Sequence, residues 1–360
     1  MSSEISTVAA SRTRQWSLDV TRVISVMGVV AIHVFAEMVG NGQVRGTGGW
    51  WAAVAADIGF VWVVPVFVMI SGALILEPRH YEDGPGPFYR RRLPRLATAL
   101  VAWSLFYFVV IRTLFSHMPV TRVDLADFVL GGKPYTHLYF LWLIIGLYAV
   151  APILASFLRG GGARRALVFA GSVLAVTVVT GMSSSVLGAM GDARPLTLLA
   201  LTQWLPYAGY FLAGWALRNA RLSGVRLVVA SLLTLAALGL SIWQYGVRPG
   251  MPLLDAVAPL SYYGPVVAVA SIGVFVCLNS ALADWRPGAR GRKVLRELSD
   301  CAFGVFLVHF AIMVVLRSID PFSRAEGSFV LSLLEWFVVV VLSFAVVFLM
   351  RRVPGVRRVV

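Results

Sequence analysis

The sequence predicts an all-α fold, an integral membrane helical bundle of about ten transmembrane helices with both termini in the cytoplasm. Two observations on composition support this: 13% of the 360 residues are charged, about half the share in a soluble domain, and 59% are hydrophobic. The third is a series of long uncharged segments, because a membrane helix needs about 20 mostly apolar residues. Together they exclude a soluble globular fold and a disordered chain, and two cysteines are too few for a disulfide scaffold.

Uncharged segments, extended through their flanks, predict each helix in turn. The expected helices are 17–39, 52–76, 94–116, 137–158, 165–187, 202–218, 225–245, 260–283, 300–317 and 328–350. The polar, basic start of the chain is followed by no small-residue cleavage site, so we expect the first helix to be retained. We expect residues 1–360 to form a single transmembrane domain with no appended soluble domain.

Basic residues alternate between the two sides of these helices. With the N-terminus inside, 23 of the 31 Lys and Arg residues fall in cytoplasmic segments, which is the positive-inside pattern. Two segments, 79–95 and 286–296, carry five each. The net charge of +14 therefore indicates membrane topology and anionic lipid rather than a nucleic-acid partner.

The first helix carries the most informative ionisable residues. Arg22 and His33 are 11 residues apart, which places them on one helix face about 16 Å apart along the axis. Glu37 lies one turn beyond His33, where it could orient the imidazole. Asp19 lies one turn before Arg22, where it could hold the guanidinium. Ionisable groups inside a membrane are costly and usually functional, so we favour a site over a histidine bonded to a neighbouring helix and an arginine anchor.

Two further segments offer candidate ligand contacts on the cytoplasmic half. Ser71 and Gly72 end an apolar run and permit the close approach of a helix or a ligand. The loop that follows carries four arginines in six positions, namely Arg90, Arg91, Arg92 and Arg95. Guanidinium groups suit a phosphorylated cytosolic ligand, although a cluster facing lipid head groups is an equal alternative on spacing alone.

Aromatic residues and histidines mark the opposite half of the bundle. His137, Tyr139 and Trp142 open the fourth helix, where they suit either an aromatic belt at the membrane interface or stacking against a sugar. His309 lies inside the ninth helix and is either a core residue or part of the same cavity as His33. Asp57 and Glu335 also need partners, which the sequence does not assign. Because no CxxC motif or Cys/His cluster is present, we expect no metal.

Taken together, these motifs resemble the acyltransferase-3 family of polytopic membrane O-acyltransferases over most of the chain. The strongest match is Arg-x10-His, here Arg22 to His33. The Ser-Gly segment at 65–72, the Arg-x-x-Arg element at 92–95, the segment from His137 to Pro152 and the late segment ending at His309 follow in the same order. Some relatives carry a fused extracytoplasmic hydrolase-like domain, which we do not expect in this chain.

The resemblance implies transfer of an acyl group, commonly acetyl from acetyl-CoA, to a hydroxyl on a sugar of a surface polysaccharide or a related acceptor. It implies a catalytic role for His33, and the spacing on the helix adds Glu37 as a second catalytic candidate. Arg22, Arg92 and Arg95 would assist in binding acyl-CoA as donor co-substrate or in building the site, and Ser71, Gly72, Arg90 and Arg91 are added as donor contacts. His137, Tyr139, Trp142 and His309 are the predicted contacts to the acceptor.

Other classes of function compete with this interpretation. A transporter or flippase for a lipid-linked or polar substrate would also carry membrane charge and a central cavity, but such proteins often contain two similar halves, which the sequence does not show. A purely structural membrane subunit would not need Arg22, His33 and Glu37 on one stripe. The partners we therefore expect are membrane lipids, acyl-CoA and a carbohydrate acceptor.

Overall fold

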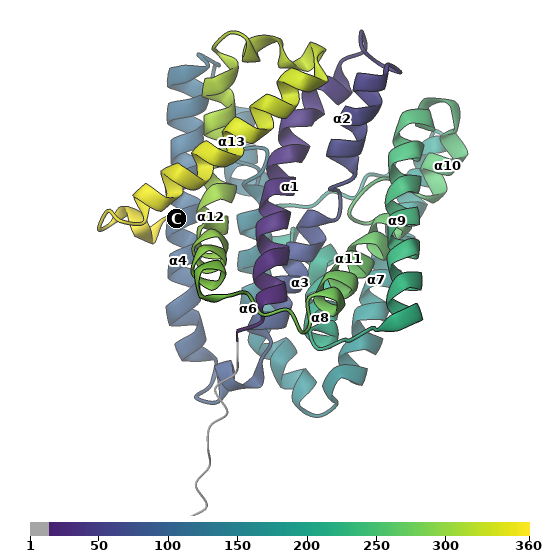
Figure 1. Cartoon of the computed structure of the whole chain (residues 1–360), viewed down its shortest axis with the longest axis vertical. Coiled ribbons are helices and arrows are strands. Elements are labelled where there is room, and N and C mark those ends of the chain that lie inside the picture. The colour runs from purple at the N-terminus through teal and green to yellow at the C-terminus, as the bar shows by residue number, and fades with distance from the viewer. Residues whose placement is uncertain (1–13) are drawn as a thin grey trace, which may run out of the picture.

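The computed structural model describes residues 14–360, and every regular element in that part of the chain is a helix (Figure 1). The basic segment predicted before the first helix lies largely in residues 1–13, outside the described residues. Within 14–360, eight helical segments are long and apolar enough to cross a membrane. They are α1 (Trp16–Gly40), α2 with α3 (Gly48–Ile58 and Val63–Ile75), α4 (Pro85–Leu105) with its π-helical continuation to Phe115, α6 (Tyr139–Arg159), α7 (Gly162–Ala189), α9 (Gly224–Val247), α12 (Ala289–Arg317) and α13 (Phe329–Met350).

Two shorter apolar helices correspond to the remaining predicted helices. They are α8 (Ala208–Leu217) and α11 (Pro265–Ala281), while α5 (Arg122–Ala126) and α10 (Pro252–Val257) are single turns in the connecting loops. The predicted all-α membrane bundle is confirmed, and the chain is a multi-pass membrane protein.

Several helix boundaries differ from the prediction for local reasons. The expected helix 52–76 is interrupted between Ile58 and Val63, and Pro65 then lies in the first turn of α3, where its missing N–H has no intrahelical partner to lose. Helices α4 and α12 begin earlier than expected, at Pro85 and Ala289. Arginine is a good helix former, so both helices continue into polar segments that hydropathy does not register.

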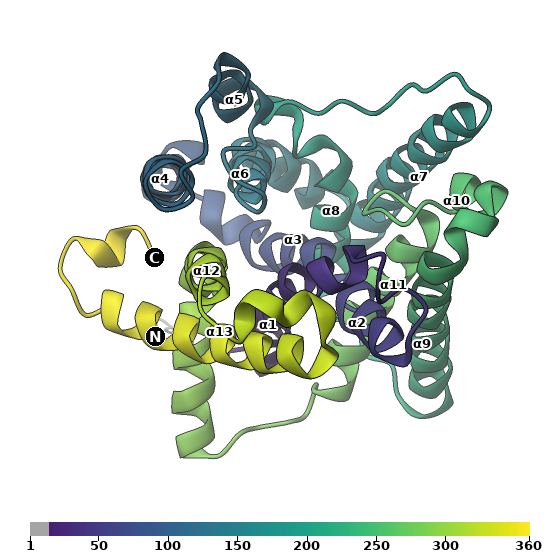
Figure 2. The same ribbon diagram turned by 90° about the horizontal axis from the view of Figure 1, so that it is seen from above.

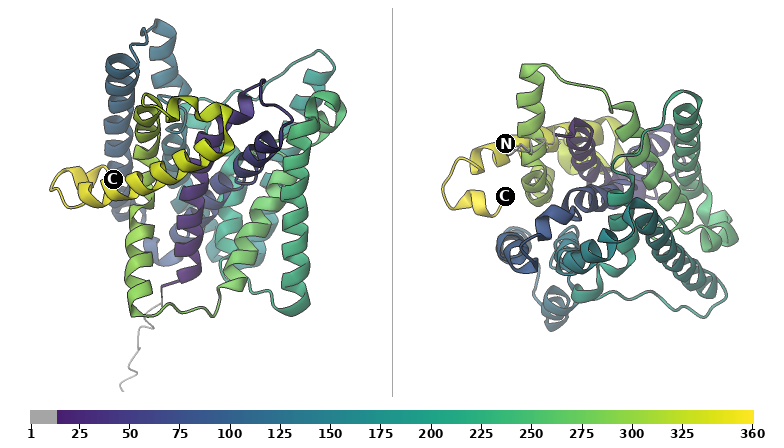
Figure 3. Two further views of the ribbon diagram at one scale, coloured as in Figure 1. Left: turned by 45° about the horizontal axis from the view of Figure 1, so that its top comes forward. Right: turned by 90° about the horizontal axis from the view of Figure 1, so that it is seen from below.

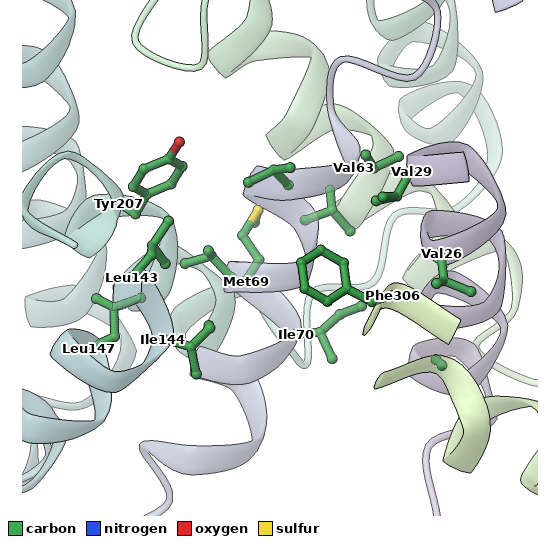
Figure 4. Close-up of a cluster of buried hydrophobic side chains, with 14 of the residues drawn as sticks. Val26, Val29, Val63, Met69, Ile70, Leu143, Ile144, Leu147, Tyr207 and Phe306 are labelled. Atoms are coloured by element: carbon green, nitrogen blue, oxygen red, sulfur yellow. The ribbon is translucent and has the colours of Figure 1, made fainter. Parts of the chain in front are cut away.

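Helix α1 is the central helix of the bundle. It contacts α2, α3, α11, α12 and α13, and in the view from above it lies among these helices (Figure 2). A close-up of the interior shows Val26 of α1, Met69 of α3, Leu143 of α6 and Phe306 of α12 in one buried apolar cluster (Figure 4). The side chains of α1 therefore face protein on most sides, so its polar residues are positioned by tertiary contacts.

The periphery of the bundle is apolar. Helices α7 and α9 lie at the outer edge (Figure 3) and expose large apolar side chains that include Val168, Val176, Leu232 and Leu235. Such a surface suits contact with lipid chains, in which the backbone hydrogen bonds of a helix are internally satisfied. Helix α13 crosses obliquely over α12 and α1 (Figure 1), which closes the bundle over the central helix.

Candidate functional site

Three histidines that are far apart in the sequence meet inside the bundle. His33 comes from α1, His137 from the turn before α6 and His309 from α12. The ring centroids of His33 and His309 are 5.4 Å apart, those of His137 and His309 are 5.0 Å apart, and those of His33 and His137 are 6.3 Å apart. The structure thus brings together three of the predicted site residues.

Aromatic side chains enclose this histidine cluster. The ring centroid of Phe310 lies 5.1 Å from that of His33, and the Phe310 ring is stacked on His137. The ring centroid of Tyr107 lies 4.9 Å from that of His137. His309 is fully buried and His137 is 2% exposed, whereas His33 is only partly buried. Of the three, His33 is the imidazole that offers the most accessible surface.

The hydrogen bonds of His309 define which of its nitrogens carries the proton. Its Nδ1 lies 2.7 Å from the carbonyl oxygen of Phe306, one turn earlier in α12. A carbonyl only accepts, so Nδ1 donates, and in the neutral ring Nε2 is then an acceptor. This Nε2 is buried and has no hydrogen-bond partner. Nor does any hydrogen bond within residues 14–360 hold the ring of His33.

The other end of α1 is tied to α12 by a polar network around Arg22. The guanidinium of Arg22 donates to Ser299 Oγ at 2.9 Å, and Ser299 donates to Asp19 at 2.7 Å. Arg22 and Asp19 are also ion-paired at 3.6 Å, which confirms the predicted contact between them. These contacts hold the guanidinium of Arg22 on the side of α1 that faces α12.

Several predicted donor contacts gather around Tyr148 of α6. The hydroxyl of Tyr148 contacts the side chain of Ser71, and its electrostatic environment includes Arg92, Arg22 and Arg95. A hydrogen bond of 2.7 Å from Tyr89 of α4 to the carbonyl of Ala149 fixes α4 against α6 at this level. Tyr148 thus contacts predicted donor residues without having been predicted itself, although it lies within the segment from His137 to Pro152.

The arginines on α4 itself are exposed. Arg90, Arg91 and Arg92 lie on the surface of the first half of the helix. Arg95 also donates to the backbone oxygen of Val360 at 3.2 Å, which links α4 to the last described residues of the chain. The arrangement offers guanidinium groups to an anionic ligand at the end of the bundle where α1 begins, the lower end in Figure 1.

Gly72 has a different role from the predicted one. It was predicted to contact the donor, but a Cβ at this position would lie 1.8 Å from the backbone oxygen of Phe211 in α8. The face of Gly72 is therefore covered by a neighbouring helix. Its small size serves helix packing, the first of the two uses that the Ser-Gly pair suggested.

Glu37 also has a different partner from the predicted one. Its carboxylate is ion-paired with Arg317 of α12, and no hydrogen bond joins it to His33. Arg317 also binds the buried carboxylate of Glu335 in α13 at 2.7 Å and donates to the carbonyl of Val34 at 3.0 Å. The predicted orientation of the imidazole by Glu37 therefore has no contact to support it, while Glu335 acquires the partner that the sequence left unassigned.

The two aromatic candidates of α6 lie outside the histidine cluster. Tyr139 is hydrogen-bonded within a group of phenols that includes Tyr207 and Tyr262. The indole N–H of Trp142 is buried without an acceptor. Acceptor contacts through Tyr139 and Trp142 remain predictions, and neither ring contacts His33.

The fold and the site together define a polytopic helical membrane protein with histidines inside the bundle and arginines at one end of the same central helix. A family model described as an acyltransferase domain, that of the acyltransferase-3 family, matches residues 15–352. The chain therefore belongs to this family, as the motifs predict, and is a membrane acyltransferase in the general sense. No curated protein and no solved structure matches it.

Proposed function

We propose that this protein is an acyl-CoA-dependent O-acyltransferase of the cell membrane. In this proposal it transfers acetyl, or another acyl group, from its CoA thioester to a hydroxyl of a sugar or glycan, which fits a role in polysaccharide modification. The single observation that carries the proposal is the geometry of α1. One continuous helix carries both Arg22, which shares the surroundings of Tyr148 with Arg92 and Arg95, and His33 in the histidine cluster. The two residues are about 16 Å apart along its axis.

The donor would bind from the end of the bundle that carries Arg22. The nucleotide end of acyl-CoA is anionic, and Arg92, Arg95 and Arg22 supply positive charge around Tyr148. The extended pantetheine arm is comparable in length with the distance from Arg22 to His33. A thioester at the end of that arm would reach the level of His33, away from the aqueous surface. This assignment requires the Arg22 end to face the cytosol, where acyl-CoA is made.

Catalysis would take place at His33. Two routes are open: the imidazole removes the proton of the acceptor hydroxyl as that oxygen attacks the thioester, or it takes the acyl group itself and passes it on. Both routes need an imidazole that is reachable from the donor site. His33 is the only partly buried ring of the three.

A substitution at Arg92 tests the donor site. Loss of one charge-assisted hydrogen bond to a phosphate costs roughly 1.5–3 kcal/mol, so Arg92→Ala should weaken acetyl-CoA binding by about 10- to 100-fold. Arg164→Ala, which removes an exposed arginine from α7, is the matched control and should bind as the wild type does. Isothermal titration of the purified proteins with acetyl-CoA measures both.

Unchanged binding in Arg92→Ala, or an equal loss in Arg164→Ala, would contradict the donor site at this position. If the folded wild-type protein binds no acyl-CoA, the transporter interpretation becomes the better one. A transporter would move its substrate without acyl-CoA and without changing the mass of the substrate.

A further inference from the structure

Two imidazoles with different surroundings face each other in the histidine cluster, and the mechanism above uses only one of them. His33 and His309 are stacked with a centroid distance of 5.4 Å and an interplanar angle of 27°. They come from α1 and α12, which pack against each other along the bundle. The two rings therefore lie side by side, so a group bound to His33 lies next to His309.

A catalytic histidine base is usually held by a further group that accepts a hydrogen bond from its N–H. That bond fixes the orientation of the ring and the nitrogen that carries the proton. His309 has such a group, because its Nδ1–H donates to the carbonyl of Phe306 at 2.7 Å and lies 3.2 Å from that of Val305. The opposite nitrogen, Nε2, keeps its lone pair and has no partner although the residue is fully buried. A buried polar atom without a partner is uncommon in a folded protein, and here it is a base.

His33 has the opposite properties. No hydrogen bond within the described residues fixes its ring, and Glu37, the carboxylate one turn further on, is ion-paired with Arg317. The His33 ring is instead held by the faces and edges of Phe310, His137 and His309. An imidazole that is held only by ring contacts has no hydrogen bond to its unprotonated nitrogen, whose lone pair stays available for bond formation.

The geometry points to a division of labour in which His33 carries the acyl group and His309 Nε2 is the catalytic base toward the acceptor. This inference rests on the proposed function. A nitrogen of His33 attacks the thioester carbonyl, the C–S bond breaks, and CoA leaves as the thiolate. The acceptor hydroxyl then gives its proton to His309 Nε2 as its oxygen bonds to the acyl carbon, and the C–N bond electrons return to His33. The proton on His309 ends on the thiolate, directly or through water, which restores both rings.

Rapid-quench kinetics with radiolabelled acetyl-CoA test this inference, with water as the acceptor. The wild type should release about one CoA per protein in a fast burst, carry one acetyl group on His33, and then turn over slowly. His309→Asn keeps a side-chain amide that can bond to the Phe306 carbonyl but removes the base. It should keep the burst and the acetyl label, while steady-state turnover falls by about 100-fold or more, the range of a lost general base.

Matched variants complete the experiment. His33→Ala should show neither burst nor label. His117→Asn is the control, because His117 has a φ of 51°, a conformation that asparagine tolerates well, and it should behave as the wild type does. His309→Gln is a second variant of the same kind should the asparagine variant fail to fold, as judged by its thermal unfolding.

The inference is overturned if the His309 variants retain wild-type turnover, or if they lose the burst as His33→Ala does. It is also overturned if the wild type turns over with no acetylated protein, a result that leaves the proposed acyl transfer intact. A wild type that neither binds acetyl-CoA nor releases its thiol removes the proposed function, and this inference falls with it.

Discussion

Gly72 of α3 makes one of the closest helix contacts in the protein. A methyl group there would meet the backbone of α8 at Phe211, and Gly214 of α8 makes the reciprocal contact with the backbone of Met69. Backbone atoms cannot move aside as a flexible side chain can. The two glycines therefore set the distance between α3 and α8, and α3 also carries Ser71 beside Tyr148.

We expect Gly72→Ala to destabilise the protein by about 1–3 kcal/mol, the usual range for overpacking a well-filled interior. Gly239→Ala is the matched control, because it lies in α9 with nothing within 4 Å of the added methyl. There the more helix-favouring alanine should be neutral or stabilising by up to about 1 kcal/mol. Thermal unfolding in detergent measures both, and equal effects in the two variants would show that the α3–α8 contact is not tight.

Single residues also show what sequence can predict of the site. Asp19 and Arg22 were expected to pair because a helix brings residues three apart together, and they do. The same local argument placed Glu37 beside His33, but Arg317, 280 positions later in the sequence, pairs with that carboxylate instead. The sequence offered His309 as part of the same cavity as His33, but it did not show that the two rings stack. Contacts within one helix follow from its period, whereas contacts between helices depend on the packing.

At the scale of elements, the ion pairs of Arg317 join three helices. Arg317 belongs to α12, binds Glu335 of α13 at 2.7 Å and Glu37 of α1, and donates to the Val34 carbonyl next to His33. Glu335 is fully buried, so it depends on Arg317 for its charge compensation. This pair fixes the helix segment that carries His33 relative to α12 and α13.

Arg317→Met should therefore cost about 3–5 kcal/mol, because it leaves a buried carboxylate without a partner. Glu335→Leu should cost less, since Arg317 keeps Glu37 and the Val34 carbonyl. The double variant should recover most of the loss of Arg317→Met, because both buried charges are then gone. A double-mutant cycle by thermal unfolding measures this coupling, and additive losses in the two variants would contradict it.

The helices themselves were largely predictable, and their exceptions are physical. Uncharged length predicted α1, α6, α7 and α9 closely, because the membrane sets the length of an apolar helix. The expected helix 202–218 instead starts at the end of one 3-10 turn, Ala200–Thr202, and contains a second, Leu205–Tyr207, with Pro206 in its first turn, before α8 begins. A hydropathy window averages over such turns, so it cannot detect where a helix begins inside an apolar stretch.

At the scale of the whole molecule, the distribution of basic residues predicts the orientation in the membrane. The Arg22 end should face the cytoplasm, where acyl-CoA is available, with both termini on that side. Gln43 and Arg290 are exposed positions that the predicted topology places on opposite sides. In a background with Cys277→Ala and Cys301→Ala, we expect a membrane-impermeant maleimide to label Gln43→Cys in intact cells. It should label Arg290→Cys only after the membrane is opened.

The reverse labelling pattern would place Arg22, Arg92 and Arg95 on the outer side of the membrane, away from the cytosol where acyl-CoA is made. Labelling of both variants in intact cells, with the membrane shown to be closed, would contradict the predicted number of crossings between the two positions.

The central claim is that His33 acts on an acyl-CoA thioester at the end of a site that begins at Arg22. The most direct measurement is thiol release from acetyl-CoA by the purified protein in detergent, with His33→Ala beside the wild type and the folding of both shown by thermal unfolding. We expect the wild type to bind acetyl-CoA and release CoA, and His33→Ala to bind it and release none above background. Undiminished release by folded His33→Ala, or no binding by the folded wild type, would contradict the account.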